Sequence, residues 1–202
     1  MLNPMMLIRS VTLMAVMGLL AACSSAPTPP PQVQIPEFLI PAPHTYGKQL
    51  FSSHVLTAEW KVNATQRQRQ QIPVNLQVTA NSTFLDASTS WGTRLLTMTY
   101  RNGKLVTEMH AELNQNMPAP GNLLQDLSIS LWPEQGLQEE LALRNWRLVD
   151  TEGQRTIYDS EGEVLITVIY TDSVQPLNGF IQFEHHQQEF TLQIQTLKHS
   201  LR

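Results

Sequence analysis

Cysteine is almost absent from this chain, because Cys23 is the only one among 202 residues. A single cysteine excludes an internal disulfide, so stability has to come from a packed core. About 150 residues are enough to bury such a core within one domain. We therefore expect one folded domain held together by apolar packing.

Long apolar runs are also lacking. The one extended uncharged run, residues 10–22, follows a single charge, Arg9, and has its apolar centre between Val11 and Leu20. A membrane-spanning helix needs about 20 apolar residues, so this run fits the h-region of a secretory signal instead. No second such run occurs, and we expect a mature chain without a spanning helix.

Charged residues are few, since they make up 15% of the chain. Acidic residues slightly outnumber basic ones, and the formal net charge is −4. Removal of residues 1–22 takes away Arg9 and no acidic residue, so the mature charge would be −5. Binding of nucleic acid or of anionic lipid surfaces by charge alone is therefore not expected. Any affinity for lipid would have to come from apolar contact.

Motifs for common chemistry are missing as well. There is no Gly-x-Ser-x-Gly nucleophile motif, no P-loop and no dinucleotide fingerprint. His185 and His186 form the only histidine cluster, and adjacent residues on a strand point to opposite faces, so they cannot readily share a metal. We expect no enzyme, no cofactor and no metal site. The tryptophans are expected in the core: Trp60, Trp91, Trp132 and Trp146.

The first motif that is present, Leu20-Ala21-Ala22-Cys23, resembles the end of a bacterial lipoprotein signal. Cleavage after residue 22 of 202 would leave 180 residues with lipid on the Cys23 thiol. Two or more acyl chains hold a protein stably on a membrane, whereas one holds it only marginally. Ser24 and Ser25 follow where inner-membrane lipoproteins often carry Asp, so the resemblance implies the periplasmic face of the outer membrane. The alternative is a lone cysteine in an ordinary signal peptide or core.

Residues 24–43 are rich in proline, which favours extended polyproline II and a semi-rigid spacer. Phe38, Leu39 and Ile40 interrupt the polar pattern near its end, which predicts that the tether docks on the folded part. The predicted organisation is a signal peptide at 1–22, a lipidated N-terminus and tether at 23–45, and one domain at 46–202.

Beyond the tether, apolar residues alternate with period two, which is typical of strands with one buried face. The pattern predicts strands over 56–62, 72–80 and 83–88, with a solvated loop at 66–71. Asn102-Gly103 favours a type I′ hairpin turn and so fixes a register. The expected pairs are Tyr100 with Leu105, Met98 with Thr107, and Leu96 with Met109.

The period then changes once, to that of helices. Asn122 is expected to cap a helix whose leucines share one stripe, and Pro133 is expected to end it and open a second. Strands resume at Asn145, where Glu152-Gly153 and Glu161-Gly162 predict the two turns of a meander. One face of the meander would carry Trp146, Leu148, Ile157, Val164, Ile166 and Val168, and a last hairpin would bury Ile181, Phe183, Phe190, Leu192 and Ile194.

About ten antiparallel strands would make a sheet roughly 48 Å wide, at about 4.8 Å per strand. Two helices about 10 Å across would cover less than half of its apolar face. The sheet can hide the remainder by curling into an incomplete barrel around the helices, which leaves an apolar pocket. The alternative is a tightly packed sandwich without a void. We expect a mainly β fold: a strongly curved antiparallel sheet around two short helices.

A lipoprotein signal, a Pro-rich tether and a curved sheet with a helical insert resemble the periplasmic lipoprotein-localisation chaperone and its outer-membrane receptor (LolA and LolB). Gly92-Thr93-Arg94-Leu95-Leu96, Leu131-Trp132-Pro133 and the 179–197 hairpin are more closely similar to a family of small proteobacterial lipoproteins of unknown function. The likeness covers most of residues 50–200. It implies an apolar half-barrel that holds acyl chains, without catalytic residues.

The resulting hypothesis is an outer-membrane lipoprotein that binds or carries an acyl chain or another apolar lipid moiety in envelope trafficking. The alternative is an accessory lipoprotein that binds a periplasmic protein partner and no lipid. Trp132 is a candidate lid or plug between the helices. The candidate pocket lining is Leu76, Val78, Leu96, Met98, Tyr100, Trp132, Ile166, Val168, Phe183, Phe190 and Leu192, all of which would serve equally well as plain core.

Overall fold

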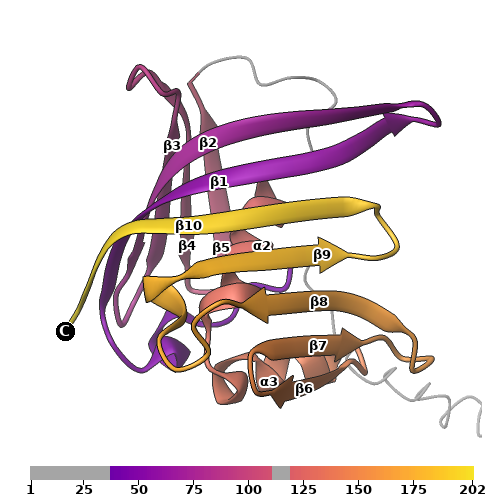
Figure 1. The fold of residues 1–202 in the computed structure, drawn as a ribbon. Coiled ribbons are helices and arrows are strands. Elements are labelled where there is room, and N and C mark those ends of the chain that lie inside the picture. Colours follow the sequence, from indigo (N-terminus) through magenta and orange to yellow (C-terminus); the bar gives the residue numbers. More distant parts are fainter. Residues whose placement is uncertain (1–36, 111–118) are drawn as a thin grey trace, which may run out of the picture. The chain divides into compact units, whose positions relative to one another are not determined.

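A computed structural model describes residues 37–110 and 119–202, which all belong to one compact unit, Ile35–Arg202. The predicted signal peptide, the predicted lipidation site Cys23 and the first part of the predicted tether lie outside the described residues. Ten strands make up about half of the unit (Figure 1). They are β1 (Leu50–Asn63), β2 (Gln66–Val78), β3 (Thr83–Ser88), β4 (Arg94–Arg101), β5 (Lys104–Met109), β6 (Arg147–Thr151), β7 (Gln154–Tyr158), β8 (Val164–Tyr170), β9 (Phe180–His185) and β10 (Phe190–Leu201).

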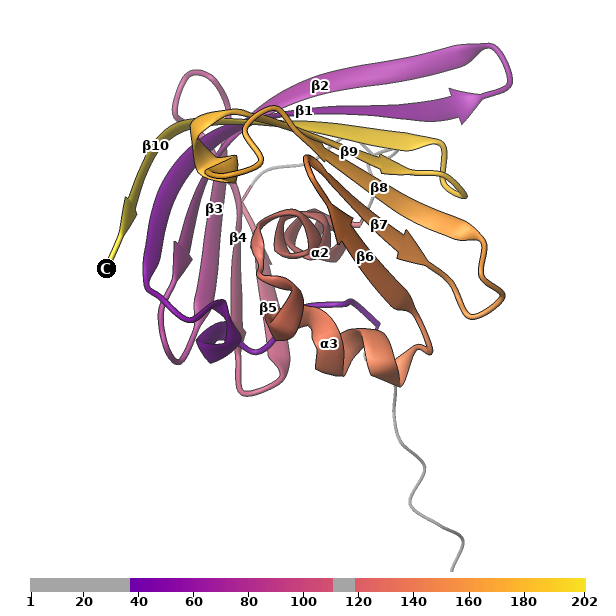
Figure 2. The ribbon, with the colours of Figure 1, turned by 60° about the horizontal axis from the view of Figure 1, so that its bottom comes forward.

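All ten strands join in one antiparallel sheet, in the order β5-β4-β3-β2-β1-β10-β9-β8-β7-β6. β1 and β10 pair with each other near the centre, and β5 and β6 form the two edges. The sheet curls without closing and wraps around helix α2 (Figure 2). The predicted incomplete barrel is thereby confirmed, and the sandwich alternative is wrong because there is one continuous sheet.

Alternation along the strands produces the apolar concave face. β1 alternates buried and half-buried side chains from Leu50 to Trp60, and β9 alternates buried and exposed ones. The Asn102-Gly103 hairpin has the predicted register, with Tyr100 opposite Leu105 and Met98 opposite Thr107. The last hairpin buries the five predicted residues, Ile181, Phe183, Phe190, Leu192 and Ile194, at 6% exposure or less.

Two helices fill the concave side, α2 (Pro120–Leu131) and α3 (Glu134–Leu143). α2 starts at Pro120, two residues before the predicted cap Asn122. Proline suits the first turn of a helix because it has no backbone N–H that would need a partner there. Trp132 and Pro133 are extended and separate the helices, so Pro133 is the N-cap of α3 rather than its first helical residue. The expected helical insert is confirmed, with its boundaries shifted.

An extended strap, residues 38–43, runs along these helices before the 3-10 helix η1 (Pro43–Tyr46). Leu39 and Ile40 are 0% and 3% exposed. The Leu39 N–H donates to Gln125 Oε1 at 2.8 Å. The ring of Phe38 lies so close to Gly121 that a Cβ there would be 2.4 Å from it. The predicted docking of the tether end is confirmed.

Three local predictions are wrong. Residues 66–71 continue β2 rather than forming a loop, because strand pairing with β1 needs backbone groups and not apolar side chains. Val164 is 39% exposed, since an irregularity in the pairing at Ile157/Tyr158 shifts the alternation of β8. Trp91 is 92% exposed between β3 and β4, not in the core.

Candidate functional site

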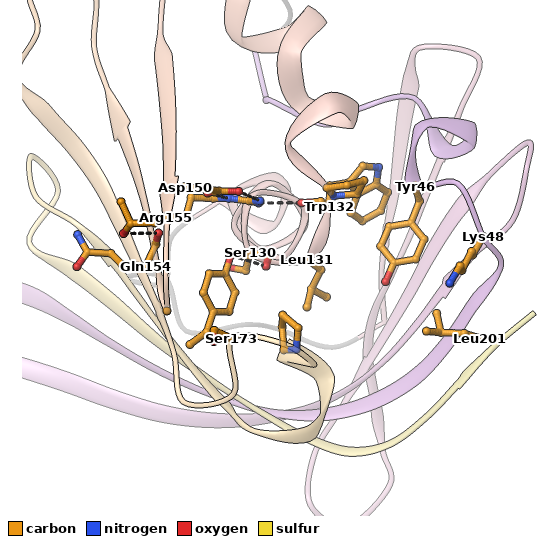
Figure 3. Close-up of a pocket in the computed structure, with 15 residues that line it drawn as sticks. Tyr46, Lys48, Ser130, Leu131, Trp132, Asp150, Gln154, Arg155, Ser173 and Leu201 are labelled. Carbon is orange, nitrogen blue, oxygen red and sulfur yellow. Dashed lines mark hydrogen bonds and ion pairs between the residues drawn. The ribbon is translucent and has the colours of Figure 1, made fainter.

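A cavity of about 470 Å³ lies at the end of the half-barrel where α2 terminates (Figure 3). Small-molecule sites typically measure about 300–1,000 Å³, so this space is large enough for one. It is lined by Tyr46, Lys48, Ser130, Leu131, Trp132, Pro133, Asp150, Thr151, Gly153, Gln154, Arg155, Tyr170, Ser173, Pro176 and Leu201. These residues come from η1, the α2–α3 junction, β6, β7, β8, the loop after β8, and β10.

Arg155 forms the polar wall of the cavity. It lies on β7, and its residue is only 6% exposed. Its Nε and Nη2 donate to the two carboxylate oxygens of Asp150, each at 2.8 Å. Its Nη1 donates to the carbonyls of Ile129 at 2.6 Å and Trp132 at 2.8 Å, which are among the last carbonyls of α2 and its cap. Arg155 therefore satisfies acceptors at the negative end of the helix dipole.

Burial and Asp150 shift the pKa of the Arg155 guanidinium in opposite directions. Burial alone would lower the pKa of Arg155, whereas the hydrogen bonds and charge of Asp150 raise it, and the net effect is upward. The guanidinium thus stays charged, and Asp150 balances it. Tyr170 adds a further bond, since its hydroxyl donates to the Ser130 carbonyl at 3.0 Å. Together these side chains fix the last turn of α2 against the sheet.

The opposite wall is built from η1. The Tyr46 ring packs edge-on against Trp132, with centroids 5.0 Å apart. Thr45 Oγ1 donates to the Gly136 carbonyl at 3.1 Å, and a Cβ on Gly136 would lie 2.7 Å from the Thr45 carbonyl oxygen. This close approach requires glycine and ties η1 to α3. Burial raises the pKa of Tyr46 to about 12, so its hydroxyl remains protonated at neutral pH.

The cavity is amphipathic. Its apolar surface comes from Leu131, Trp132, Pro133, Pro176 and Leu201, and its polar groups stand on the two walls. Figure 3 shows Arg155 and Asp150 on one side and Tyr46 and Lys48 on the other. Such an arrangement suits a ligand with an apolar body and a polar end.

The interior of the half-barrel also holds buried polar groups on α2. Ser128 and Ser130 donate to the carbonyls of Leu124 and Asp126, both at 2.7 Å. Asp126 is 3% exposed, and burial raises its pKa well above the usual range of a carboxyl, although a hydrogen bond from Gln125 acts against this. Its carboxyl is therefore favoured in the neutral form.

The predicted lining residues lie on the concave side and in the helix junction, and ten of the eleven are 6% exposed or less. Tyr100 is half-buried. Trp132 borders the cavity between the helices, whereas Leu76 and Tyr100 border two other surface cavities. The remaining eight border none of the cavities described and pack in the core: Val78, Leu96, Met98, Ile166, Val168, Phe183, Phe190 and Leu192. Their role toward a ligand stays a prediction.

Sequence reasoning missed the polar walls. One signal was available for Arg155, because it shares a strand face with Ile157 and so places a charge among apolar positions. Tyr46 and Lys48 carry no such signal, since they lie in irregular chain before β1.

The described residues offer neither a cluster of metal ligands nor a membrane-spanning helix. Within residues 37–110 and 119–202, no three His, Cys, Asp or Glu side chains gather as metal ligands would. In the same residues, no helix has both the length and the apolar character needed to cross a membrane.

Comparison with known proteins places the chain in a sequence family. The sequence model of a family of proteins of unknown function, DUF3261, matches residues 55–198. No curated protein matches the chain. This family was expected from the short motifs around Gly92 and Trp132, and the expectation is confirmed.

Three solved structures are similar in fold. A LolA superfamily protein from Nitrosomonas europaea is 9% identical over 80% of this chain and 90% of its own, with a TM-score of 0.44. An outer membrane lipoprotein-sorting protein domain from Vibrio parahaemolyticus is 11% identical over 78% and 86%, with a TM-score of 0.33. A DUF1329 family protein from Desulfovibrio piger is 7% identical over 79% and 92%, with a TM-score of 0.34. At these values the likeness carries no functional argument.

Proposed function

This chain belongs to DUF3261, a family of proteins of unknown function, and from this premise we propose that it binds or carries an acyl chain or another apolar lipid moiety. The observation that carries the proposal is the amphipathic cavity of about 470 Å³ at the end of α2. It opens beside an apolar concave sheet that is covered by two helices and a strap rather than by a second sheet.

The energetic case rests on apolar burial. Each methylene removed from water contributes about 0.8 kcal/mol, so ten of them contribute about 8 kcal/mol before the costs of association. Leu131, Pro176 and Leu201 offer apolar surface for such a chain. No catalytic residue is needed for this role.

The place of action is proposed from the N-terminal sequence. Lipid on Cys23 would anchor the protein to the outer membrane on its periplasmic side, and the tether would hold the half-barrel near the bilayer. A role in envelope lipid or lipoprotein trafficking follows from this position.

The test is binding of a fluorescent fatty acid, with native mass spectrometry for co-purifying lipid. Ser173 lines the cavity and is exposed, so Ser173→Trp should fill the cavity without disturbing the core. Val174 is its neighbour, is 85% exposed and does not line the cavity, so Val174→Trp is the matched control. We expect Ser173→Trp alone to weaken uptake. Absence of uptake by the wild-type protein would reject the proposal.

A second candidate function is binding of a protein partner at a sheet edge. β5 pairs only with β4 among the described strands, and its Val106 and Met109 are 55% and 49% exposed. An added strand could pair there. Thr107 lies at a position of β5 whose N–H points away from β4, so a Thr107→Pro variant that loses a co-purifying protein but keeps lipid uptake would favour this candidate.

A further inference from the structure

Two polar groups in the cavity wall have no partner in the part of the chain that the structure describes. The Lys48 ammonium and the Tyr46 hydroxyl both line the cavity, and among the described residues neither takes part in a hydrogen bond or ion pair. Figure 3 shows them on the same wall, opposite Arg155. In contrast, the Arg155 charge is already matched by two bonds to Asp150. Lys48 thus supplies the uncompensated charge of the lining.

Other unpaired cations lie at the same end of the sheet. Strand pairing links Tyr100, Thr83, Val78, Leu50 and Leu201 in one row across five strands. The basic residues close to this row, none of them ion-paired within the described part of the chain, are Lys48, Arg101, Lys104 and Lys198.

The surroundings of Lys48 do not cancel this charge. The backbone oxygen of Arg202 accepts the Gln49 N–H at 2.9 Å, and the Arg202 guanidinium adds a positive charge to the region. A smaller cavity that Lys48 and Arg202 share contains no Asp or Glu in its lining. Although the chain has a net charge of −4 and Glu134 acts on Arg155 at the opposite wall, Lys48 leaves an unpaired positive charge on its own wall of the cavity.

We propose that the cavity selects an anionic amphiphile, whose carboxylate or phosphate binds between the Lys48 ammonium and the Tyr46 hydroxyl while its chain lies on Leu131, Pro176 and Leu201. This inference rests on the proposed function and names the ligand class for it. Hydrogen bonds between charged partners are about twice as strong as neutral ones, so the head group would set selectivity.

The wall is held in place before a ligand arrives. Tyr46 is fixed by its contact with Trp132, and η1 is fixed by the Thr45 bond to Gly136. A hydroxyl that is already positioned loses little freedom on binding. The Tyr46 hydroxyl also stays a donor at neutral pH, as its pKa of about 12 requires.

The experiment compares dodecanoate, dodecyl phosphate and dodecanol, each below its aggregation concentration, on the full chain without its signal. The wild-type protein should bind either anion about tenfold more tightly than dodecanol, a preference that added salt weakens. Lys48→Ala should remove this preference by weakening the binding of both anions more than that of dodecanol, and Tyr46→Phe should reduce the preference. Lys104→Ala is the control, since Lys104 is an unpaired cation at the same end that does not line the cavity.

The outcomes separate the two proposals. If no probe binds, the proposed lipid-binding function fails, and this inference fails with it. If dodecanol binds the wild type as tightly as the anions, lipid binding stands and the anionic selectivity is wrong. If Lys48→Ala keeps the preference while its unfolding curve matches wild type, the assignment to Lys48 is wrong. Competition by inorganic phosphate against dodecyl phosphate would support an anion subsite, and preference for dodecanoate would identify a carboxylate ligand.

Discussion

His54 is a buried histidine on the concave face, 1% exposed, with Ser52 Oγ at 2.8 Å from Nε2 and Thr196 Oγ1 at 3.1 Å from Nδ1. Burial, followed by the nearby charge of His199, lowers its pKa from 6.5 to about 4. Between these values the unfolded chain binds a proton that the folded chain does not. Stability should therefore fall as pH falls from 6.5 to 4, by up to about 3 kcal/mol from this residue.

The check is urea unfolding of wild type and His54→Gln from pH 7.5 to 4. His54→Gln should lose stability at pH 7.5, because it disturbs two buried bonds, but show a shallower decline toward pH 4. His186→Gln, at an exposed histidine, is the control. Parallel pH profiles for wild type and His54→Gln would contradict the prediction.

Asp126 should change the pH dependence of stability in the direction opposite to His54. Burial raises its pKa in the folded protein, so the unfolded chain releases its proton first as pH rises. The folded state is therefore penalised at neutral pH and relieved near pH 4. Asp126→Asn should be more stable than wild type at pH 7 and equal to it near pH 3.8, by chemical denaturation. An equal gain for exposed Glu152→Gln would show that net charge, not burial, is the cause.

Arg155 is the residue that closes the end of α2. Arg155→Met keeps the apolar stem but leaves Asp150 and two helix carbonyls without their donor. We expect a loss of about 2–3 kcal/mol in the free energy of unfolding, since buried acceptors lose their partner while Asp150 remains partly solvated. Arg67→Ala, in the exposed pair with Glu59, should cost at most about 1 kcal/mol. Similar losses for both would refute the assigned role.

At the scale of helices and strands, the sequence predicted the elements whose structure depends on neighbouring residues alone. Asn102-Gly103 fixed a hairpin register because its turn type permits only one pairing, and the 179–197 hairpin followed from alternation. The extension of β2 through 66–71 could not be foreseen, because polar strands in a long hairpin carry no apolar pattern. The cavity walls were missed for a related reason: they join η1 and β7, which only the curl of the sheet brings together.

The contact between the strap and α2 predicts that the effect of Gly121→Ala on stability changes sign when the Phe38 ring is removed. Gly121→Ala would normally favour a helix by up to about 1 kcal/mol, but here the new Cβ would lie 2.4 Å from the Phe38 ring. The variant should lose about 1–3 kcal/mol by overpacking. In a Phe38→Ala background the same change should be neutral or stabilising. A double-mutant cycle by denaturation measures this, and additive effects would contradict it.

At the scale of the whole molecule, net charge proved a poor guide to local potential. The net charge of −4 predicted no binding of nucleic acid or of anionic lipid surfaces by charge alone. Among the described residues, the fold gathers unpaired cations from three separate segments at one end, namely Lys48, the β4–β5 hairpin and β10. The Arg67–Glu59 ion pair lies in the long β1–β2 hairpin, and the Lys61–Glu189 pair joins that hairpin to the β9–β10 turn. A sum over the sequence cannot show this separation, because it depends on which strand ends meet.

The extent of the folded unit leads to the last prediction. Residues 23–45 were expected to be tether, yet Leu39 and Ile40 are buried to 0% and 3% exposure within them. Their burial is worth about 3–6 kcal/mol, offset in part by the entropy of ordering the strap. A protein that starts at residue 46 should thus be about 2 kcal/mol less stable than one that starts at residue 35. At about 2–4 °C per kcal/mol, its melting temperature should fall by about 4–8 °C.

The full-length double variant Leu39→Ser, Ile40→Ser separates loss of these contacts from loss of chain. Its melting temperature should be close to that of the shortened protein. It should also bind more of an apolar dye than the wild type does, because the strap no longer covers α2. Equal melting temperatures for the proteins starting at 35 and 46 would mean that the strap and the first three residues of η1 add nothing to stability. The domain would then begin at residue 46, and the buried side chains of the strap would be free to leave when a ligand enters.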